Sequence, residues 1–284
     1  MSNAPALWRI EHPVLEGASA VPLIVNVPHA GTYLPPRIAA QLTPAGLGVP
    51  DTDWHVDKLY DFAPAMGATL MVATHSRIVA DLNRDPTGDA LYPGASNTGI
   101  CPTSTFFDEA IYLPGLVPGQ AEMAARIDQY WRPYHRQLSA EIARIKAKHG
   151  VCIVLDGHSI VSEVPRFFDG RLPDLNLGTA DGKSCESSLA QTAFQVLSHA
   201  DGFTAVHNGR FKGGYITRHY GEPGNSVHAL QLEMAERCYM DESQPRHYDG
   251  LRAGSLIAVL KTLLEHLLAR CAALDAQTRK QDLY

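Results

Sequence analysis

Short runs of apolar residues along the chain predict strands that are buried on both faces. The clearest runs are residues 22–27, 69–73 and 151–155. Continuous rather than alternating hydrophobicity is typical of strands in the interior of a parallel sheet. Shorter runs predict further extended segments at residues 78–82, 203–206 and 229–233.

Apolar residues at helical spacing predict helices between these strands. The expected helices cover about residues 53–62, 120–149, 187–198 and 251–274. Pro133 should kink the second helix or divide it in two, because proline removes a backbone donor. Gly150 should end that helix.

Strands that alternate with helices indicate an α/β fold. We predict a single domain over residues 1–284, with a mixed, largely parallel central sheet flanked by helices. Two stretches, about 85–119 and 160–183, show no helical or strand pattern. Irregular segments of this length inside a compact domain are usually functional or disordered, and we predict that both are active-site loops.

The charge and the cysteine pattern limit the partners and the compartment. A net charge of -6 and a pI near 6.1 do not suggest the clustered basic surface of a nucleic-acid-binding protein. The five cysteines are widely spaced and form no CxxC pair, which suits reduced thiols in a cytoplasm. Residues 1–13 have no signal-peptide pattern, and charged residues interrupt the helix 251–274, so neither export nor a membrane span is expected.

Two histidines follow buried strands at positions where α/β proteins bind their ligands. His29 comes after the run 22–27, and His158 comes after the run 151–155. In open α/β sheets the usual site lies beyond the carboxyl ends of the strands. Two histidines and one carboxylate would bind a catalytic zinc ion and leave one position for water. We favour Asp53 as the carboxylate.

The neighbours of Asp53 stay open as alternatives, namely Asp51, His55 and Asp57. Each candidate also has a purely structural interpretation: most histidines are core or surface residues, and Asp53 could cap the following helix. Asp156 is better explained as a group that orients a metal-bound histidine than as a ligand itself.

A group of arginines and an asparagine is a second candidate for chemistry. Arg77, Asn83 and Arg84 flank the segment 78–82. The planar fork of an arginine matches a carboxylate with two parallel hydrogen bonds, so this group predicts recognition of a carboxylate. The alternative is a structural network of these arginines with neighbouring aspartates.

Two later segments carry further polar groups of interest. The glycine-rich stretch 208–221 could present Tyr215 and Arg218 to an anionic ligand from a mobile loop, or could form a plain hairpin. Its spacing matches neither a P-loop nor a dinucleotide fingerprint. Glu233 ends the apolar run 229–233, where burial would raise its pKa as a general base requires. A structural role is the alternative for Glu233.

Together these segments resemble the N-formylglutamate amidohydrolase family, specifically its deformylase branch. The matching motifs are N-V-P-H-A-G (26–31), D-T-D-W (51–54), S-R (76–77), D-L-N-R (81–84), D-G-H-S (156–159), G-G-Y-I-T-R-H-Y-G (213–221) and Q-L-E (231–233). They cover nearly the whole chain in the expected order, and they are specific as a set although each is weak alone. The family is distantly similar to the zinc carboxypeptidases and to aspartoacylase and succinylglutamate desuccinylase, which implies a phosphorylase/hydrolase-like fold.

The resemblance implies one divalent ion, Zn²⁺ with Co²⁺ or Mn²⁺ as alternatives, bound by His29, Asp53 and His158. It also implies that Glu233 is the catalytic carboxylate and that Arg77 lies near the scissile carbonyl. The chain departs from the carboxypeptidases at Thr32, because those enzymes have an acidic ligand three residues after the first histidine.

The remaining implications concern the substrate. Asn83 and Arg84 would bind a substrate carboxylate, with Arg218 as a further candidate. The implied reaction is metal-assisted hydrolysis of N-formyl-L-glutamate to formate and L-glutamate, the closing step of one route of histidine degradation. The alternatives are a hydrolase of another N-acyl amino acid or a short peptide, and a metal-free anion-binding protein with the same fold.

Overall fold

The computed structural model describes residues 4–13, 20–88 and 98–281. At its centre lies a seven-stranded sheet with the strand order β1-β3-β2-β4-β7-β5-β6. The strands are β1 (Trp8–Glu11), β2 (Leu23–Val27), β3 (Thr69–Ala73), β4 (Cys152–Ile160), β5 (Leu175–Gly178), β6 (Ala205–His207) and β7 (Val227–Ala235). The predicted strands at 22–27 and 69–73 are thus confirmed.

The sheet is mixed and largely parallel, as predicted. β3, β2, β4 and β7 form a parallel centre. β1 pairs antiparallel with β3 at one edge. On the other side β5 runs antiparallel to β7, and β6 runs parallel to β5.

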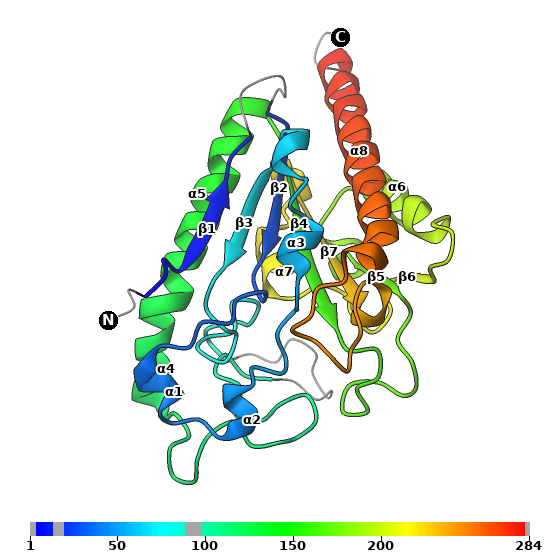
Figure 1. Cartoon of the computed structure of the whole chain (residues 1–284). Coiled ribbons are helices and arrows are strands. Elements are labelled where there is room, and N and C mark those ends of the chain that lie inside the picture. The colour runs from blue at the N-terminus through cyan, green and yellow to red at the C-terminus, as the bar shows by residue number, and fades with distance from the viewer. Residues whose placement is uncertain (1–3, 14–19, 89–97, 282–284) are drawn as a thin grey trace.

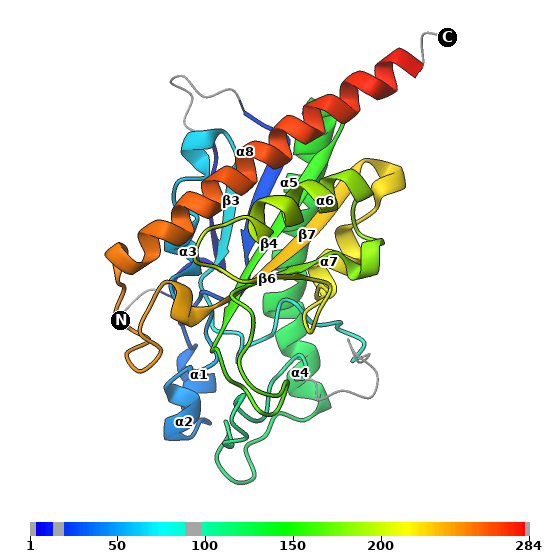
Figure 2. The same cartoon turned by 90° about the vertical axis from the view of Figure 1, so that its right-hand side faces the viewer.

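Helices cover both faces of the sheet (Figure 1). The α-helices are α1 (Pro36–Ala39), α2 (Pro44–Leu47), α3 (Val56–Leu59), α4 (Gln120–Arg126), α5 (Arg132–His149), α6 (Ser187–Ser198), α7 (Tyr215–Tyr220) and α8 (Gly250–Gln281). Figure 2 shows α8 running across the near face of the sheet while α5 lies behind it. One apolar core packs between the sheet and α5 and α7, and a larger one packs under α3, α6 and α8.

Short 3-10 helices complete the chain: η1 (Pro64–Met66), η3 (Ala180–Gly182), η4 (Pro223–Asn225) and η5 (Glu236–Cys238). A π-helical segment, η2 (Ile127–Trp131), joins α4 to α5. This segment ends two residues before Pro133, so the predicted helix 120–149 is divided where the proline removes a backbone donor. Gly150 ends α5 in the left-handed conformation, with φ of 78°, as predicted.

Alternation along β4 decides which side chains face which layer. Cys152 and Val154 point into the core beneath α5, whereas Ile153 and Leu155 point into the core beneath α8. Since side chains alternate along a strand, Asp156 and His158 continue the row that starts with Cys152. The α5 face of β4 therefore changes from apolar to polar toward its carboxyl end.

Two predictions about the strands were wrong in detail. The strand predicted at 151–155 continues through Ile160, so His158 lies within β4 and not in a loop after it. Residues 78–82 form turns and irregular chain instead of a strand, although Ile78 and Asp81 are buried. Burial explains the apolar pattern of this segment, and its hydrogen bonds come from a turn.

The helices and loops also differ from the prediction in places. The helix expected at 53–62 is reduced to the single turn α3 (Val56–Leu59). The stretch 160–183, predicted to be irregular, contains β5 and η3. In the stretch 85–119 no helix or strand occurs among residues 85–88 and 98–119, and residues 89–97 lie outside the described residues. Within the part that is described, no helix is long and apolar enough to cross a membrane.

Candidate active site

The carboxyl ends of three adjacent parallel strands bring the polar residues together. His29 follows β2 directly, His158 lies near the end of β4, and Glu233 lies near the end of β7. His158 and Glu233 are register partners, and so are Asp156 and Gln231 one step earlier. Partners in register point to the same face of a sheet, so these four side chains from β4 and β7 form one polar patch.

His29, Asp53 and His158 form a compact group of possible metal ligands. One ligand atom from each residue lies within 4.8 Å of the others. Asp53 Oδ2 lies 2.9 Å from His158 Nδ1 and 3.6 Å from His29 Nδ1. All three side chains are buried. The carboxylate of Asp53 therefore lies between the Nδ1 atoms of the two imidazoles.

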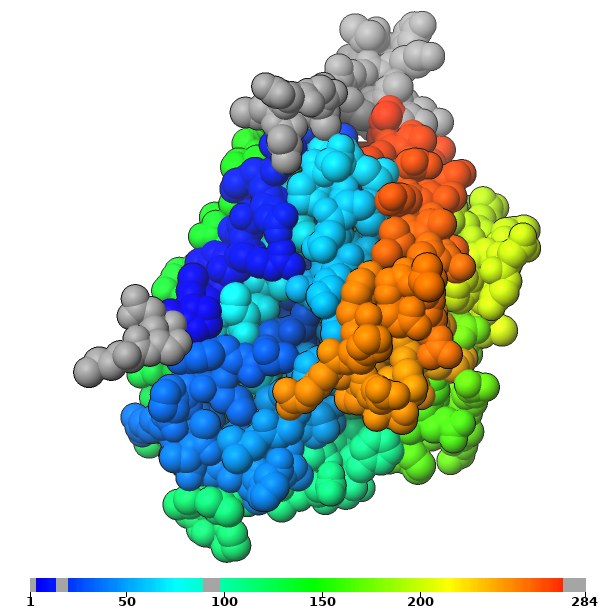
Figure 3. Space-filling view, viewed as in Figure 1, coloured from blue at the N-terminus to red at the C-terminus, as the bar shows by residue number. Residues whose placement is uncertain are grey.

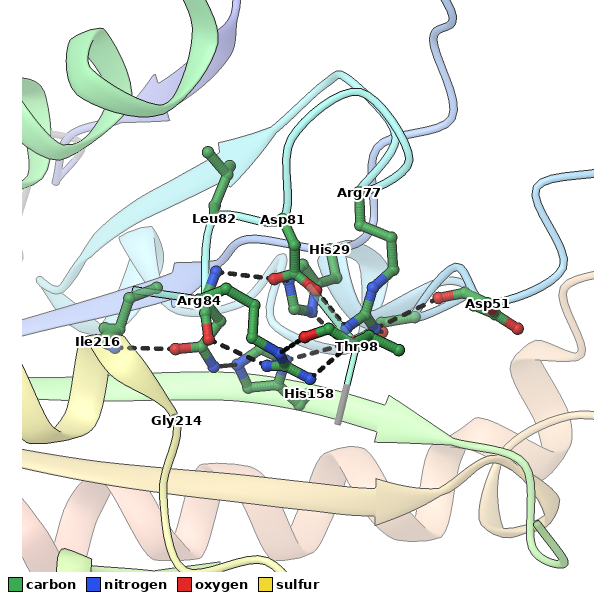
Figure 4. Close-up of polar contacts among 12 residues, drawn as sticks. His29, Asp51, Arg77, Asp81, Leu82, Arg84, Thr98, His158, Gly214 and Ile216 are labelled. Atoms are coloured by element: carbon green, nitrogen blue, oxygen red, sulfur yellow. Dashed lines mark hydrogen bonds and ion pairs between the residues drawn. The ribbon is translucent and has the colours of Figure 1, made fainter. Parts of the chain in front are cut away.

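The opposite nitrogen of each imidazole is paired with a buried carboxylate, and Figure 4 shows Asp81 beside His29. His29 Nε2 lies 2.8 Å from Asp81 Oδ1, and His158 Nε2 lies 2.9 Å from Asp156 Oδ2. A carboxylate on one ring nitrogen fixes the ring and leaves the other nitrogen with a lone pair. Asp156 thus contacts His158 in the way expected for a group that orients a ligand.

Unpaired buried atoms at this place fit a cation. Among the described residues, His29 Nδ1 and Asp53 Oδ1 are buried without a hydrogen-bond partner. Leaving such atoms unpaired costs about 1–3 kcal/mol each. Burial acts to raise the pKa of Asp53, but His29 and His158 outweigh it and hold the pKa below its ordinary value. An ionised carboxylate and two oriented imidazoles form a donor set suited to a divalent metal ion.

The alternatives to Asp53 lie elsewhere. Asp51 accepts a hydrogen bond from the backbone N–H of Phe106 at 3.1 Å. Asp57 pairs with Arg9 at 3.0 Å. His55 adopts a left-handed backbone, with φ of 62°, and its Nε2 lies 2.9 Å from the carbonyl oxygen of Pro245. None of these three side chains belongs to the group formed by the two histidines and Asp53.

The segment 239–249 covers the loop that carries Asp53. The Tyr239 hydroxyl donates to Trp54 O at 2.7 Å and can accept from the Ser159 hydroxyl, whose Oγ lies 2.8 Å away, and these contacts tie this loop to β4. Arg246 donates to Gly48 O at 3.2 Å and lies over the Trp54 ring. Figure 3 shows the segment, in orange, packed against the blue N-terminal part of the chain. This segment packs over the loop that carries Asp53, whose side chain is buried.

Glu233 lies next to the His-Asp-His group, and its pKa is shifted in the opposite direction from that of Asp53. Burial raises its pKa to about 7. Its Oε2 accepts a hydrogen bond from Gln231 Nε2 at 3.0 Å, and its side chain lines a pocket together with His29 and His158. A carboxylate with a pKa near neutrality can both accept and release a proton at neutral pH.

Arg77 supplies positive charge to the same pocket. Its Nη2 donates to Asp81 Oδ2 at 2.7 Å, and its Nη1 lies 3.5 Å from Asp53 Oδ1. Its guanidinium carbon lies 5.1 Å from the centre of the Phe106 ring. Because Asp81 also holds His29, a single buried carboxylate fixes both Arg77 and a candidate ligand.

Asn83 lines the pocket but is held mainly by the protein itself. Its Oδ1 accepts from the backbone N–H of Ile216 at 2.8 Å. Its Nδ2 lies 3.0 Å from His158 Nε2 and 3.3 Å from Asp156 Oδ2. A Cβ on Gly214 would lie 2.3 Å from Asn83 Nδ2, so the close approach of α7 to Asn83 requires glycine at this position.

The remaining predicted residues divide into two groups. Arg84 lines the pocket, and donates to Thr98 O and Thr98 Oγ1, both at 3.0 Å. Tyr215 and Arg218 are absent from the described lining. Tyr215 packs against Trp131 with ring centres 5.3 Å apart, and Arg218 is exposed with its Nε donating to Gly213 O. The structure therefore does not bring these two residues to the pocket.

Arg210 is a pocket residue to which the sequence analysis assigned no role. Its position depends on β5 and β6, and β5 was not predicted. The signal available was a basic residue inside the glycine-rich stretch 208–221, which also contains Arg218 and does not distinguish between them. Three aromatic residues also line the pocket: Phe106 is buried, and the partly exposed Phe167 and Phe211 lie toward its mouth.

Comparisons with known proteins agree with this arrangement. A family model described as FGase, N-formylglutamate amidohydrolase, matches residues 21–240. The N-formylglutamate deformylase of Pseudomonas aeruginosa is 47% identical over 249 residues, which are 88% of this chain and 93% of that protein. The N-formylglutamate deformylase of Pseudomonas putida is 45% identical with the same coverage, 88% and 93%.

Solved structures show the same fold. The crystal structure of N-formylglutamate amidohydrolase from Ralstonia eutropha JMP134 matches with a TM-score of 0.78 and 25% identity, over 96% of this chain and 100% of that one. A gene product from Agrobacterium tumefaciens matches with a TM-score of 0.64 over 92% of this chain and 96% of its own, and its 18% identity supports the fold alone. The motif set, the family match over residues 21–240 and the curated relatives agree, and the chain belongs to the N-formylglutamate amidohydrolase family.

Proposed function

We propose that this protein hydrolyses N-formyl-L-glutamate to formate and L-glutamate. One observation carries the proposal: a His-Asp-His group beside a buried glutamate, in a pocket that arginines line. The names of the two Pseudomonas relatives support the substrate. In the histidine-degradation route implied by the family, this reaction would be the closing step.

His29, Asp53 and His158 would hold one divalent ion. Two imidazoles and a carboxylate suit Zn²⁺, with Co²⁺ or Mn²⁺ as alternatives. When bound, such an ion supplies a Lewis acid for the formyl oxygen and a water of lowered pKa. Asp81 and Asp156 would keep the two imidazoles in the orientation that directs Nδ1 to the ion.

The reaction adds water across the amide bond. The hydroxyl of the water joins the formyl carbon, the C–N bond breaks, and the nitrogen leaves as the amine of glutamate after it gains a proton. Glu233 is positioned to accept the proton of the water and to pass it to the departing nitrogen, since burial brings its pKa to about 7. The proton is conserved within the site, so no other donor is required.

Arg77 would stabilise the negative charge that develops on the formyl oxygen. It is fixed before the reaction by Asp81, and preorganised charge of this kind typically contributes about 10²–10³ in rate. Arg84 would bind a substrate carboxylate, with its guanidinium oriented by Thr98.

Metal analysis and a substrate comparison test the proposal. The purified protein should release formate from N-formylglutamate faster than it releases acetate or succinate from the N-acetyl and N-succinyl analogues. His29→Ala and His158→Ala should each lose bound metal and activity, whereas His199→Ala, on the exposed end of α6, should keep both. Full metal content in both site variants would refute the ligand assignment. A preference for another acyl group would refute the substrate.

A further inference from the structure

The substrate proposed above carries two carboxylates, and the pocket has more than one arginine to meet them. The described residues that line it include three arginines: Arg77, Arg84 and Arg210. A buried carboxylate needs a partner of opposite charge, because an unpaired ion in a dry site costs several kcal/mol. The question is which arginine takes which carboxylate.

Arg77 is already surrounded by acidic groups. Burial acts to lower its pKa, but Asp81, Asp53 and Asp51 outweigh it and raise the pKa above the ordinary value. The positive charge of Arg77 is therefore compensated within the protein. Arg84 and Arg210, the other two arginines of the pocket, are therefore better candidates than Arg77 for the carboxylates of the substrate.

Arg84 lies on the side of the histidines. It follows Asn83, whose amide nitrogen is 3.0 Å from His158 Nε2, and its own Nη1 donates to Asn83 O at 3.0 Å. Arg84, Thr98 and His158 line the same pocket, and Figure 4 shows the contact between Arg84 and Thr98. The α-carboxylate of N-formylglutamate is attached to the carbon that bears the scissile amide, so it must remain close to the reacting carbonyl. Arg84 suits this carboxylate.

Arg210 lies against the loop that forms the mouth of the pocket. Its Nε donates to Phe167 O at 2.7 Å, and its guanidinium carbon lies 5.7 Å from the Phe167 ring centre and 5.4 Å from the Phe211 ring centre. A hydrogen bond at Nε and two aromatic neighbours fix the plane of the guanidinium. Arg210 thus offers an oriented cation beside the aromatic residues of the pocket.

The chain after Arg210 is held firmly. Ala180 N donates to Lys212 O at 2.6 Å, and Gly178 and Gly214 are packed so closely against Lys212 and Asn83 that a Cβ would clash at either glycine. Phe167 contacts Phe106 with ring centres 5.0 Å apart, and this contact joins the mouth loop to the segment beneath Arg77. A fixed cation of this kind loses little entropy when it binds an anion.

We propose that Arg210 binds the γ-carboxylate of the substrate and thereby selects acidic over neutral formylamino acids. This inference rests on the proposed function, because it assumes N-formylglutamate as the substrate. Three carbons separate the two carboxylates of the substrate, so the γ-carboxylate can bind a different arginine of the pocket from the α-carboxylate. Arg210 acts by recognition and takes no part in the chemical step.

Kinetics with a matched pair of substrates test this role. N-formylglutamine has the shape of N-formylglutamate, but a neutral amide replaces the γ-carboxylate. Arg210→Gln should lower kcat/KM for N-formylglutamate by about 100-fold, as expected for loss of one partner of a buried charge pair. For N-formylglutamine it should change kcat/KM by less than about threefold. Arg171→Gln, an exposed arginine in the 161–174 loop, serves as the control and should alter neither value.

The outcomes separate this inference from the proposed function. If the wild-type protein does not hydrolyse N-formylglutamate, the function itself is wrong. If the wild type is active and Arg210→Gln lowers both substrates equally, Arg210 only supports the fold of the mouth, and the inference is overturned. No loss with either substrate overturns it as well.

A second variant covers the case in which Arg210→Gln folds poorly. Arg210→Lys keeps the charge and loses the fork, so kcat/KM for N-formylglutamate should fall by about tenfold. A larger loss for N-formylglutamine than for N-formylglutamate would contradict the assignment. A third substrate, 4-formamidobutanoate, lacks the α-carboxylate, and its kcat/KM should remain sensitive to Arg210→Gln. Insensitivity would show that Arg210 binds the α-carboxylate instead.

Discussion

His158 of β4 and Glu233 of β7 are register partners in adjacent parallel strands. Neighbouring strands lie about 4.8 Å apart, and partners in register point to the same face. The hydrogen bonds of the sheet therefore set the spacing between a candidate metal ligand and the candidate base. A site on a strand framework is positioned more accurately than one on loops. His29 and Asp53, which lie in loops, complete the His-Asp-His group.

Glu233→Gln should separate metal binding from catalysis. The amide has nearly the same shape but cannot accept a proton from water, so kcat should fall by about 10²–10⁴. Metal content measured on the purified variant should equal that of the parent, because Glu233 is not in the His-Asp-His group. Glu163→Gln, at an exposed glutamate, is the matched control. Parental kcat in Glu233→Gln would remove this residue from the mechanism.

The sequence contained enough to predict the central strands and the three candidate ligands. The runs at 22–27, 69–73 and 151–155 are apolar on both faces because helices cover both sides of the sheet. Such strands can be predicted from a single sequence, since burial on two faces leaves a continuous apolar run. The polar residues at their carboxyl ends break that run, and they indicated His29 and His158 for the same reason.

Other parts were not predictable because hydrophobicity reports burial and not conformation. Residues 78–82 are as buried as a strand, yet they form turns and irregular chain. The contacts of the Asp81 carboxylate with Arg77 and His29 hold this segment in place. β5 pairs with β7 only through tertiary structure, and its four residues, Leu-Asn-Leu-Gly, are too short an alternation to predict a strand. Arg210 follows β6, which pairs with β5, so its place in the pocket was missed together with that strand.

Asp156→Asn should weaken metal binding. Asp156 Oδ1 accepts from Asn26 Nδ2 at 2.7 Å, and Oδ2 lies 2.9 Å from His158 Nε2. Whichever way an asparagine amide turns here, its NH₂ faces another donor. We expect metal affinity to fall about 10–100-fold and the free energy of unfolding to fall by about 1–3 kcal/mol. Competition with a chromophoric chelator measures the affinity.

The control for Asp156→Asn is Asp201→Asn, which makes the same chemical change at an exposed turn. It should leave the metal dissociation constant unchanged. Equal affinity in Asp156→Asn and the parent would show that His158 keeps its orientation without this carboxylate.

Gly214→Ala should disturb the pocket through Asn83. The added methyl would lie 2.3 Å from Asn83 Nδ2, while Gly214 N is fixed by a hydrogen bond to Gln231 Oε1 at 2.7 Å. Overpacking of a buried site typically costs about 1–3 kcal/mol, and displaced Asn83 should lower kcat/KM. Gly224→Ala is the control, because nothing lies within 4 Å of a Cβ there. Urea unfolding would contradict the prediction if both variants were equally stable.

His135 should make stability depend on pH in mildly acidic solution. Burial lowers its pKa from 6.5 to about 3. Its Nε2 lies 2.9 Å from Leu82 O and its Nδ1 lies 2.9 Å from Tyr220 Oη, so the neutral ring donates to the carbonyl and accepts from the hydroxyl. Between these two pKa values the unfolded chain binds a proton that the folded chain does not. Acidification through this window therefore favours unfolding.

The free energy of unfolding should fall by about 1.4 kcal/mol per pH unit from this residue as the pH drops below 6.5, and His135 should contribute no slope above it. His135→Gln removes the titrating group and keeps hydrogen-bonding capacity. Urea unfolding of the parent and of His135→Gln is measured at pH 4.5, 5.5, 6.5 and 7.5 with a chelator present. The comparison isolates the effect of His135 because every other titratable group is the same in the two proteins. The free energy of unfolding of the parent minus that of His135→Gln should decrease from pH 6.5 to pH 4.5 and stay constant above pH 6.5. Parallel curves throughout would mean that folding does not shift the pKa of His135, which would contradict the prediction.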